Sequence, residues 1–345
     1  MGRAQGSVTM SDVARTAGVS LKTVSNVLNG YRYLRPETKA RVEAAIAALG
    51  YQVNVTARNL AQGRTRLIKL AIPELRNPYF AELADSIVHE AFARGLTVLL
   101  EAYHYDHNAE HRVLRGDTRS LVDGVVFSPV NVGQTESALF NVNFPLVVLG
   151  ETIFGAPCDH VTMRNIEGAR AQVEHLVQLG RRKIAIIGYN DTRVSSASLR
   201  YKGAMTALAA AGLPVDPELV EGPGVWLRST GALLMGQILD RRKGVDAVVC
   251  FNDALALGAI HELGNRGVRV PDDVAVIGFD NVEDTEFARP TLSSIDPGRE
   301  QIARTAIQML CERMGLVDGF DPAGPPREVF ADFRLVPRES TLGRA

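Results

Sequence analysis

The sequence of 345 residues contains few cysteines and few aromatic residues, and lacks long apolar runs. Its three cysteines, Cys158, Cys250 and Cys311, are far apart and odd in number, which is typical of reduced thiols and not of a disulfide framework. No run approaches the roughly 20 apolar residues of a membrane-spanning helix, and the first residues lack the apolar stretch of a secretory signal. We therefore expect a cytoplasmic protein with no membrane association.

Motifs of nucleotide-binding and hydrolytic enzymes are also missing. None of the patterns G-x-G-x-x-G, G-x-x-x-x-G-K-[ST] and G-x-S-x-G follows a strand-like run, and no paired acid and base stands out. We expect no catalytic residues and no cofactor, so the sequence argues against an enzyme.

The net charge of −1 is unevenly distributed along the chain. Residues 1–66 hold 10 Lys and Arg against 3 Asp and Glu, whereas the rest hold 28 against 36, which gives a head of +7 and a body of −8. A basic head can neutralise phosphates, and an acidic body avoids indiscriminate binding to nucleic acid. Small N-terminal domains are often basic by chance, so charge alone does not identify a partner.

Residues 8–28 predict two short helices around a tight turn. Ser11 and Asp12 supply cap-type residues at the start of the first helix, and Gly18 supplies the turn. The apolar residues of that helix fall on one stripe: Met10, Val13, Ala14 and Ala17. The second helix begins after Ser20, a good N-cap. Its inward stripe is Val24, Val27 and Leu28, and its opposite side carries Lys22, Ser25, Asn26 and Asn29.

The polar side of this second helix can be interpreted in two ways. Side chains of the Lys, Asn and Ser type read base edges in a major groove, where a helix-turn-helix places its second helix. The same pattern also fits the solvated surface of a small helical hairpin. A third helix is predicted over residues 36–49, with Pro36 at its first position and Gly50 at its end. Residues 54–61 form a segment too short to be a stable helix without a partner.

Apolar strand-like runs alternate with amphipathic helices after residue 66. The predicted strands are 67–73, 96–103, 123–129, 145–150, 183–189, 246–251, 273–279 and 291–295. Near-continuous apolar strands separated by helices predict parallel sheets that are covered on both faces. Because eight such strands are many for one domain of this kind, we expect two lobes, each a doubly wound sheet.

Ligands of open α/β sheets bind beyond the carboxyl ends of the strands, so residues just past each strand are candidates. They are Tyr79, Phe80, Tyr103, Arg200, Trp226, Asn252, Asp253 and Asp280. Charged and amide groups can hold hydroxyls or a carboxylate, and aromatic faces pack against a sugar or a flat base. Alternatively, Asn252 or Asp253 caps the following helix, Asp280 fixes a turn, and Trp226 belongs to the core.

Three histidines, His104, His107 and His111, lie close together in the sequence. Spacings of three and four could bring them onto one side of a helix, as metal sites require. Asp106 and Asn108 instead indicate the start of an ordinary helix. We expect no metal ion there.

The stretch TMSDVARTAGVSLKTVSNVLN closely resembles the helix-turn-helix of the lactose-repressor (LacI/GalR) family, and the resemblance continues to the chain's end. It implies a small all-α helix-turn-helix head over residues 1–53, a hinge helix and linker over 54–66, and a core over 67–345. That core is the α/β, two-lobed, periplasmic-binding-protein-like type with two doubly wound parallel sheets. Lobe 1 is expected at about 67–163 and 292–325, and lobe 2 at about 164–291 and 326–345.

The resemblance implies DNA contacts in the head and hinge. They are Thr9, Ser20, Leu21, Lys22, Thr23, Ser25, Asn26, Asn29, Tyr51, Asn54, Ala57, Arg58 and Leu60. In the family, two hinge helices meet over the minor groove and a leucine, here Leu60, wedges between base pairs. Ordinary packing is the alternative for Leu60. The chain departs from the family at Arg35, where a small hydroxyl residue is usual, and at Val53, where proline is common.

The resemblance also implies the function. Arg200, Trp226, Asn252 and Asp280 fall where sugar- and purine-responsive members contact effectors, whereas Gly150 falls where some sugar-binding members have an acidic residue. We expect a repressor that binds a palindromic double-stranded operator as a homodimer, controlled by a small effector, a sugar or sugar derivative. The alternative is a soluble sugar-binding protein of the periplasmic type, which would need a signal peptide and no DNA-binding head.

Overall fold

The computed structural model describes residues 8–28, 31, 33–51, 64–117, 121–189, 195–222, 224–241 and 244–343. The chain divides into two compact units, residues 1–65 and 66–345. Five residues predicted to contact DNA lie outside the described residues, as does the predicted hinge helix: Asn29, Asn54, Ala57, Arg58 and Leu60.

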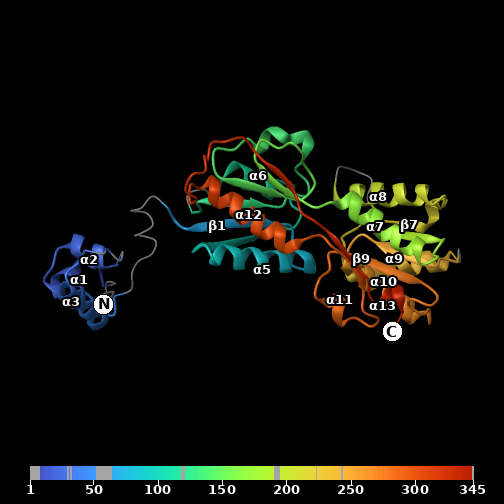
Figure 1. Cartoon of the computed structure of the whole chain (residues 1–345), viewed down its shortest axis with the longest axis horizontal. Helices are drawn as coiled ribbons and strands as arrows, with labels where there is room; N and C mark the ends of the chain where they lie inside the picture. Colours follow the sequence, from blue (N-terminus) through green and yellow to red (C-terminus); the bar gives the residue numbers. More distant parts are fainter. Residues whose placement is uncertain are drawn as a thin grey trace, which may run out of the picture. The chain divides into compact units, whose positions relative to one another are not determined.

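The first unit contains the three predicted helices: α1 (Met10–Ala17), α2 (Leu21–Leu28) and α3 (Pro36–Leu49) (Figure 1). Their inward stripes meet in one small core of Val13, Ala14, Ala17, Val24, Val42, Ala45 and Tyr51. The predicted apolar stripes of α1 and α2 therefore form the packing surface that holds the head together.

The start of α1 and the turn after it are fixed by local hydrogen bonds. The N-cap is Thr9, one residue before the helix, and not Ser11 as predicted. The Thr9 hydroxyl accepts from the Asp12 backbone N–H at 3.3 Å, and the Asp12 carboxylate accepts from the Thr9 N–H at 3.0 Å, a reciprocal capping box. Gly18 has φ 61°, a conformation that glycine adopts without strain. The Arg41 guanidinium donates to two carbonyl oxygens of this turn at 3.2 and 3.0 Å, which ties α3 to it.

The second unit contains two six-stranded sheets (Figure 1). The first has the order β11-β5-β4-β3-β1-β2 and only parallel pairs. Its strands are β1 (Leu67–Ile72), β2 (Thr97–Ala102), β3 (Gly124–Phe127), β4 (Leu146–Leu149), β5 (Asp159–Thr162) and β11 (Glu328–Phe330). The second has the order β12-β10-β9-β8-β6-β7, and only its edge strand β12 is antiparallel to its neighbour. Its strands are β6 (Ile184–Ile187), β7 (Val220–Glu221), β8 (Ala247–Cys250), β9 (Ala275–Phe279), β10 (Ser293–Asp296) and β12 (Arg334–Val336).

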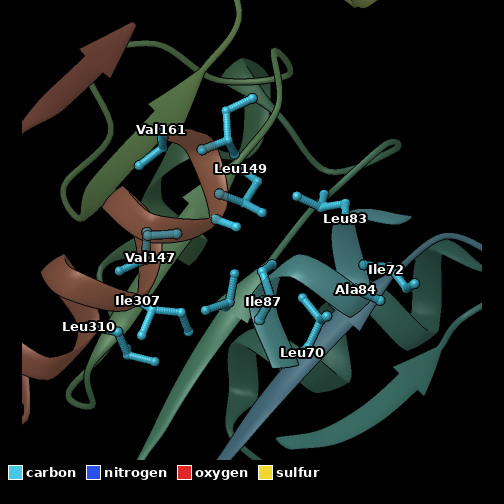
Figure 2. Packing of buried hydrophobic residues seen from close by; sticks show 14 of the residues in the cluster. Leu70, Ile72, Leu83, Ala84, Ile87, Val147, Leu149, Val161, Ile307 and Leu310 are labelled. Carbon is cyan, nitrogen blue, oxygen red and sulfur yellow. The ribbon is translucent and has the colours of Figure 1, made fainter. Parts of the chain in front are cut away.

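Helices cover both faces of the first sheet. They are α5 (Pro78–Phe92) and α12 (Arg299–Arg313) on one face, and α6 (His107–Arg115) and the 3-10 helix η1 (Gln134–Phe140) on the other. Figure 2 shows Leu83 and Ile87 of α5 and Ile307 of α12 meeting Leu70 of β1 and Val147 of β4. Burial of these aliphatic side chains holds the helices on the sheet.

The second sheet is covered in the same way, and successive strand residues point to opposite faces. Ala185 and Ile187 of β6 pack towards α9 (Arg228–Asp240) and α10 (Asp253–Asn265). Ile184 and Ile186 pack towards α7 (Asn165–Gln178) and α8 (Ser196–Ala210). Three shorter helices complete the lobe: η2 (Pro217–Leu219), α11 (Asp284–Phe287) and α13 (Glu339–Leu342). The predicted fold of two doubly wound lobes is confirmed.

The chain passes between the lobes three times, and the structure corrects two predicted boundaries (Figure 1). The first passage, between β5 and α7, lies where it was predicted. Strand β10 extends the second sheet to Asp296 by pairing with β9, so the second passage follows residue 296 and not 291. Strand β11 extends the first sheet to Phe330 by pairing with β5, so the third passage lies between 330 and 334 and not at 325.

The three cysteines are free thiols, as predicted. Cys250 lies at the end of β8 in the core, where burial raises the pKa of its thiol. No helix among the described residues combines the length and the apolar character needed to cross a membrane.

Candidate functional site

A cavity of about 340 Å³ lies between the two lobes of the second unit, within the size range of small-molecule sites. The first lobe contributes the start of α5 and the residues that follow β3, β4 and β5. The second lobe contributes the start of α8, the segment before α9 and the residue after β9. Five of the predicted effector residues line it: Tyr79, Phe80, Arg200, Trp226 and Asp280. The cavity therefore lies at the carboxyl ends of the parallel strands, as expected.

Arg200 is the positively charged group of this cavity, and its position is fixed by several partners. Its side chain, on α8, is buried, and its Nε donates to Asn165 Oδ1 at 2.7 Å. Its Nη1 donates to the backbone oxygen of Phe251. The guanidinium lies over the Phe279 ring, 3.6 Å from the centroid. Burial lowers the pKa of Arg200, and the nearby Asp280 carboxylate opposes that shift. This arrangement presents an oriented cation to a ligand.

Asp280 provides an acidic group beside this cation. Its Oδ1 lies 3.7 Å from Arg200 Nη2, and its backbone has φ 113°, in the turn after β9. Burial raises the pKa of Asp280 to about 7, although the positive charges of Arg200 and Arg299 lower it. The carboxyl group is therefore poised to change its protonation state when a ligand binds.

Glu151 is a second acidic group of the cavity, and the sequence analysis missed it. The Ser196 hydroxyl donates to Glu151 Oε2, a bond that joins the two lobes. Glu151 Oε1 and Thr162 Oγ1 are buried and have no hydrogen-bond partner among the described residues. Both residues line the cavity, so these atoms can find partners in a ligand. The signal in the sequence was an acid directly after the strand-like run 145–150, beside the Gly150 that the resemblance singled out.

A hydrogen bond and a ring contact fix the positions of the aromatic residues that line the cavity. Trp226 Nε1 donates to the backbone oxygen of Gly188 at 3.1 Å. Tyr79 and Phe80 form an edge-to-face pair with ring centroids 5.4 Å apart. Burial raises the pKa of the Tyr79 hydroxyl, which stays protonated and can donate a hydrogen bond. The cavity thus offers apolar faces next to a few polar groups.

Tyr103 and Asn252 were predicted to bind an effector, but they are not among the residues that line the cavity. The Tyr103 hydroxyl donates to the backbone oxygen of Ser128 at 2.6 Å. Asn252 is the N-cap of α10, the alternative considered from the sequence, and its Oδ1 accepts from the Leu255 N–H at 2.9 Å. Its Nδ2 donates to the backbone oxygen of Trp226 at 3.2 Å, so Asn252 positions a residue that does line the cavity.

Asp253 was also predicted for the cavity and lies elsewhere. Its Oδ1 accepts from the Ser294 hydroxyl at 2.6 Å and its Oδ2 from the Val282 N–H at 3.0 Å. A Cβ at Gly278 would lie 2.1 Å from Asp253 Oδ1, so glycine is required at that position of β9. Burial raises the pKa of Asp253, as does the negative charge of Asp280. Asp253 therefore fixes the turn that carries Asp280.

The predicted DNA-contacting residues of the head are mostly exposed or half-buried. Those on its surface are Thr9, Ser20, Leu21, Lys22, Thr23, Ser25 and Asn26. Leu21 is 53% exposed, which is unusual for leucine and leaves an apolar group beside Lys22 at the start of α2. Ser20 caps α2 by accepting from the Thr23 N–H at 3.1 Å. Tyr51 differs from the prediction, because its side chain packs in the head's core and is only 9% exposed.

Comparisons with known proteins agree with both units. Residues 9–54 match the pattern of the family described as bacterial regulatory proteins, lacI family, and residues 173–341 match the periplasmic binding protein-like domain. The chain is 34% identical over 313 residues to the transcriptional repressor PurR of Pectobacterium atrosepticum, which covers 89% of this chain and 90% of that one. The chain belongs to the lacI family of bacterial regulatory proteins.

Solved structures of lacI-family members share the fold. A transcriptional regulator from Sanguibacter keddieii has a TM-score of 0.74 and 44% identity, over 81% of this chain and 100% of that one. The lac repressor dimer bound to operator and to the anti-inducer ONPF has a TM-score of 0.84 and 27% identity, over 97% of this chain and 99% of that one. Membership of this family makes the chain a DNA-binding transcriptional regulator.

Effector binding to this lacI-family chain is expected to depend on pH through Asp280. An ionised carboxylate accepts hydrogen bonds from a ligand through both oxygens, whereas a protonated one has lost its charge and donates through one of them. Because burial raises the pKa of Asp280 to about 7, effector affinity should fall as the pH drops through this value and level off above it. Calorimetric titration across this pH range checks the effect. Asp280→Asn should bind weakly at every pH, and a variant that keeps the wild-type pH profile would contradict the assignment.

Proposed function

We propose that the chain is a sequence-specific transcriptional repressor whose affinity for an operator is controlled by a small molecule bound between its lobes. The observation that carries this proposal is a pair of buried oxygens without a hydrogen-bond partner among the described residues, Glu151 Oε1 and Thr162 Oγ1, in the lining of the cavity between the lobes. Buried polar atoms normally have partners, so these atoms favour a ligand that supplies hydrogen-bond donors. The same chain carries a helix-turn-helix of the lacI family.

The chemistry of the lining favours a neutral, hydroxyl-rich effector, a sugar or sugar derivative. The charged residues of the described lining are Glu151 and Asp280 against Arg200 alone. Two acidic groups accept from hydroxyls but repel a carboxylate or a phosphate. The flat faces of Tyr79 and Trp226 suit the C–H surface of a sugar ring.

The effector acts by changing how the lobes are joined. The bond from Ser196 to Glu151 is one of the links across the cavity. A ligand that donates to Glu151 Oε1 and also reaches Arg200 or Asp280 adds new links beside the Ser196 bond and joins the lobes in a different arrangement. The coupling free energy between effector binding and operator binding then equals the difference in the free energy of effector binding between the two arrangements, typically about 1–3 kcal/mol.

The protein works as a homodimer on a palindromic double-stranded operator, as the lac repressor does in its solved complex. It needs no cofactor and has no catalytic activity, and it acts in the cytoplasm. A soluble sugar-binding protein without a transcriptional role would share the lobes and the cavity, but it would have no use for the head.

Selection of bound duplexes from a randomised DNA pool tests this function. The purified full chain should enrich one palindromic sequence at moderate salt. Asn26→Ala should relax the preference at one base position of each half-site, because a good base contact contributes about 1–3 kcal/mol. Lys39→Ala serves as a control, since Lys39 lies on α3 and pairs with Glu43. Binding that depends on salt but not on sequence, with every added ligand tested, would overturn the proposal.

A further inference from the structure

Two histidines and one glutamate converge on the first lobe, at a point separate from the lining of the cavity. His107 and His111 lie four residues apart on α6, and therefore on one face of that helix. Glu136 comes from η1, 25 positions after His111. His107 Nε2 lies 3.2 Å from His111 Nε2 and 3.1 Å from Glu136 Oε2, and His111 Nε2 lies 2.9 Å from Glu136 Oε1.

Hydrogen bonds alone do not account for this arrangement. Each imidazole Nε2 carries at most one hydrogen, and an ionised carboxylate carries none. Two hydrogens cannot supply three separate contacts, so the contact between the two histidines has no hydrogen of its own when both donate to Glu136. All three groups can instead direct a lone pair at one common centre.

The spacing of these donor atoms fits a metal ion placed between the three side chains. Ligand atoms bonded to zinc at about 2.0–2.1 Å in a tetrahedral arrangement lie roughly 3.3 Å from one another. The two imidazole Nε2 atoms lie 3.2 Å apart, close to that spacing, and each has one Glu136 oxygen beside it, Oε2 at 3.1 Å from His107 and Oε1 at 2.9 Å from His111. One ligand atom from each residue lies within 4.8 Å of the others, so a small movement of the carboxylate brings one oxygen within reach of an ion that both imidazoles bind. We propose that His107, His111 and Glu136 bind a divalent transition-metal ion of the zinc type.

The donor atoms select this class of ion. Two imidazoles and a carboxylate suit zinc and its neighbours, whereas calcium and magnesium prefer ligands that are all oxygen. The side chains of His107, His111 and Glu136 are 50%, 22% and 29% exposed, so an ion can enter from solvent and keep water in a fourth position. The sequence analysis expected no metal because Asp106 and Asn108 indicate the start of an ordinary helix, and it did not consider Glu136, which lies 25 positions after His111. His104 precedes the helix and is not part of the group.

The ion would link α6 to η1 and so restrain residues that line the cavity. The Glu110 carboxylate of α6 accepts from the backbone N–H groups of Val130, Asn131 and Val132, at distances from 2.7 to 3.3 Å. Val130 and Asn131 line the cavity, and η1 follows them. The loop between β3 and η1 would then be held at both ends by the metal-bound pair of helices.

Zinc titration of the untagged, chelator-treated full chain tests the site. Calorimetry should detect one zinc ion per chain, and cobalt substituted for zinc should give the visible absorption of a tetrahedral site. His111→Gln and Glu136→Gln should each weaken binding at least tenfold, because each removes one of three protein ligands. Hydrogen exchange should slow on zinc addition in α6 and in residues 130–136.

The matched control is His261→Gln. His261 is an exposed histidine that contacts a polar partner four residues away, Asn265, and it forms no ion pair with a carboxylate of the described residues. This variant should bind zinc as the wild type does. Circular dichroism without metal checks that His111→Gln and Glu136→Gln remain folded. The proposal is overturned if zinc does not saturate one site, if the His111 and Glu136 variants bind it unchanged, or if the protected segment lies elsewhere.

Discussion

Glu151→Gln is expected to weaken effector binding by roughly 10- to 100-fold and to leave operator binding unchanged. A hydrogen bond to a charged acceptor contributes about 1.5–3 kcal/mol, and each 1.4 kcal/mol corresponds to a factor of ten in affinity. The substitution removes the charge and replaces one acceptor oxygen by a donor, while the size of the side chain is kept. The unpartnered Oε1 is the atom expected to receive the ligand's hydroxyl. Effector titration by calorimetry and operator binding by fluorescence anisotropy, with and without effector, measure the two effects separately.

Glu101→Gln is the matched control for this experiment. Glu101 lies on β2 of the same lobe, pairs with Lys69 and is not among the residues that line the cavity. Its variant should bind both effector and operator normally. If Glu151→Gln responds to effector as the wild type does, Glu151 does not contact the ligand. If both variants lose operator binding, loss of charge in this lobe is the cause and not loss of a ligand contact.

The sequence predicted eight strands of the described structure and missed β5, β7, β11 and β12, each no longer than four residues. β4 has the sequence LVVL and is buried along its whole length, so its apolar side chains predict a strand without knowledge of its neighbours. β5 is DHVT, and it becomes a strand because β4 and β11 pair with it on either side. Its Asp159 and His160 are buried through tertiary partners that a linear pattern does not contain. Fold class could therefore be predicted from composition and periodicity, but short strands that depend on pairing with their neighbours could not.

Five of the predicted effector residues line one cavity, but positions after strands could not settle which other residues belong to it. Asp253 and Asp280 both follow strands, and only tertiary structure distinguishes them. The Asp253 carboxylate is used by Ser294 and Val282, whereas Asp280 reaches the cavity. Glu151 was missed because the resemblance pointed to position 150, where this chain has glycine, and the acidic residue of the cavity stands one position later. The role of each polar residue therefore depends on whether its side chain already forms hydrogen bonds within the fold.

Asp159→Ala is expected to lower the free energy of unfolding of the second unit by about 3 kcal/mol. Asp159, at the start of β5, is fully buried, and both of its oxygens accept from Arg313 at the end of α12 and from Arg327 before β11. Removing the carboxylate takes away the acidic partner of Arg313, whereas Arg327 keeps Glu312, and breaking a buried pair costs about 3–5 kcal/mol. The partial exposure of Arg327, at 34%, places the expected value at the lower end of that range. Urea-induced unfolding followed by circular dichroism measures the change.

The pH dependence distinguishes this ion-pair network from simple loss of packing. Burial alone would raise the pKa of Asp159, but hydrogen bonds from Arg313 and Arg327 lower it below the ordinary value of 3.8. The stabilising contribution is therefore complete above 3.8 and is lost only as the pH falls through the lowered value. The deficit of the variant should be equal at about pH 7 and pH 5. Asp240→Ala, which removes an exposed partner of Arg266, should leave the urea midpoint unchanged. A deficit in Asp159→Ala no larger than in Asp240→Ala would show that the two arginines find water or other acceptors, and that β11 and α12 are held to β5 by packing alone.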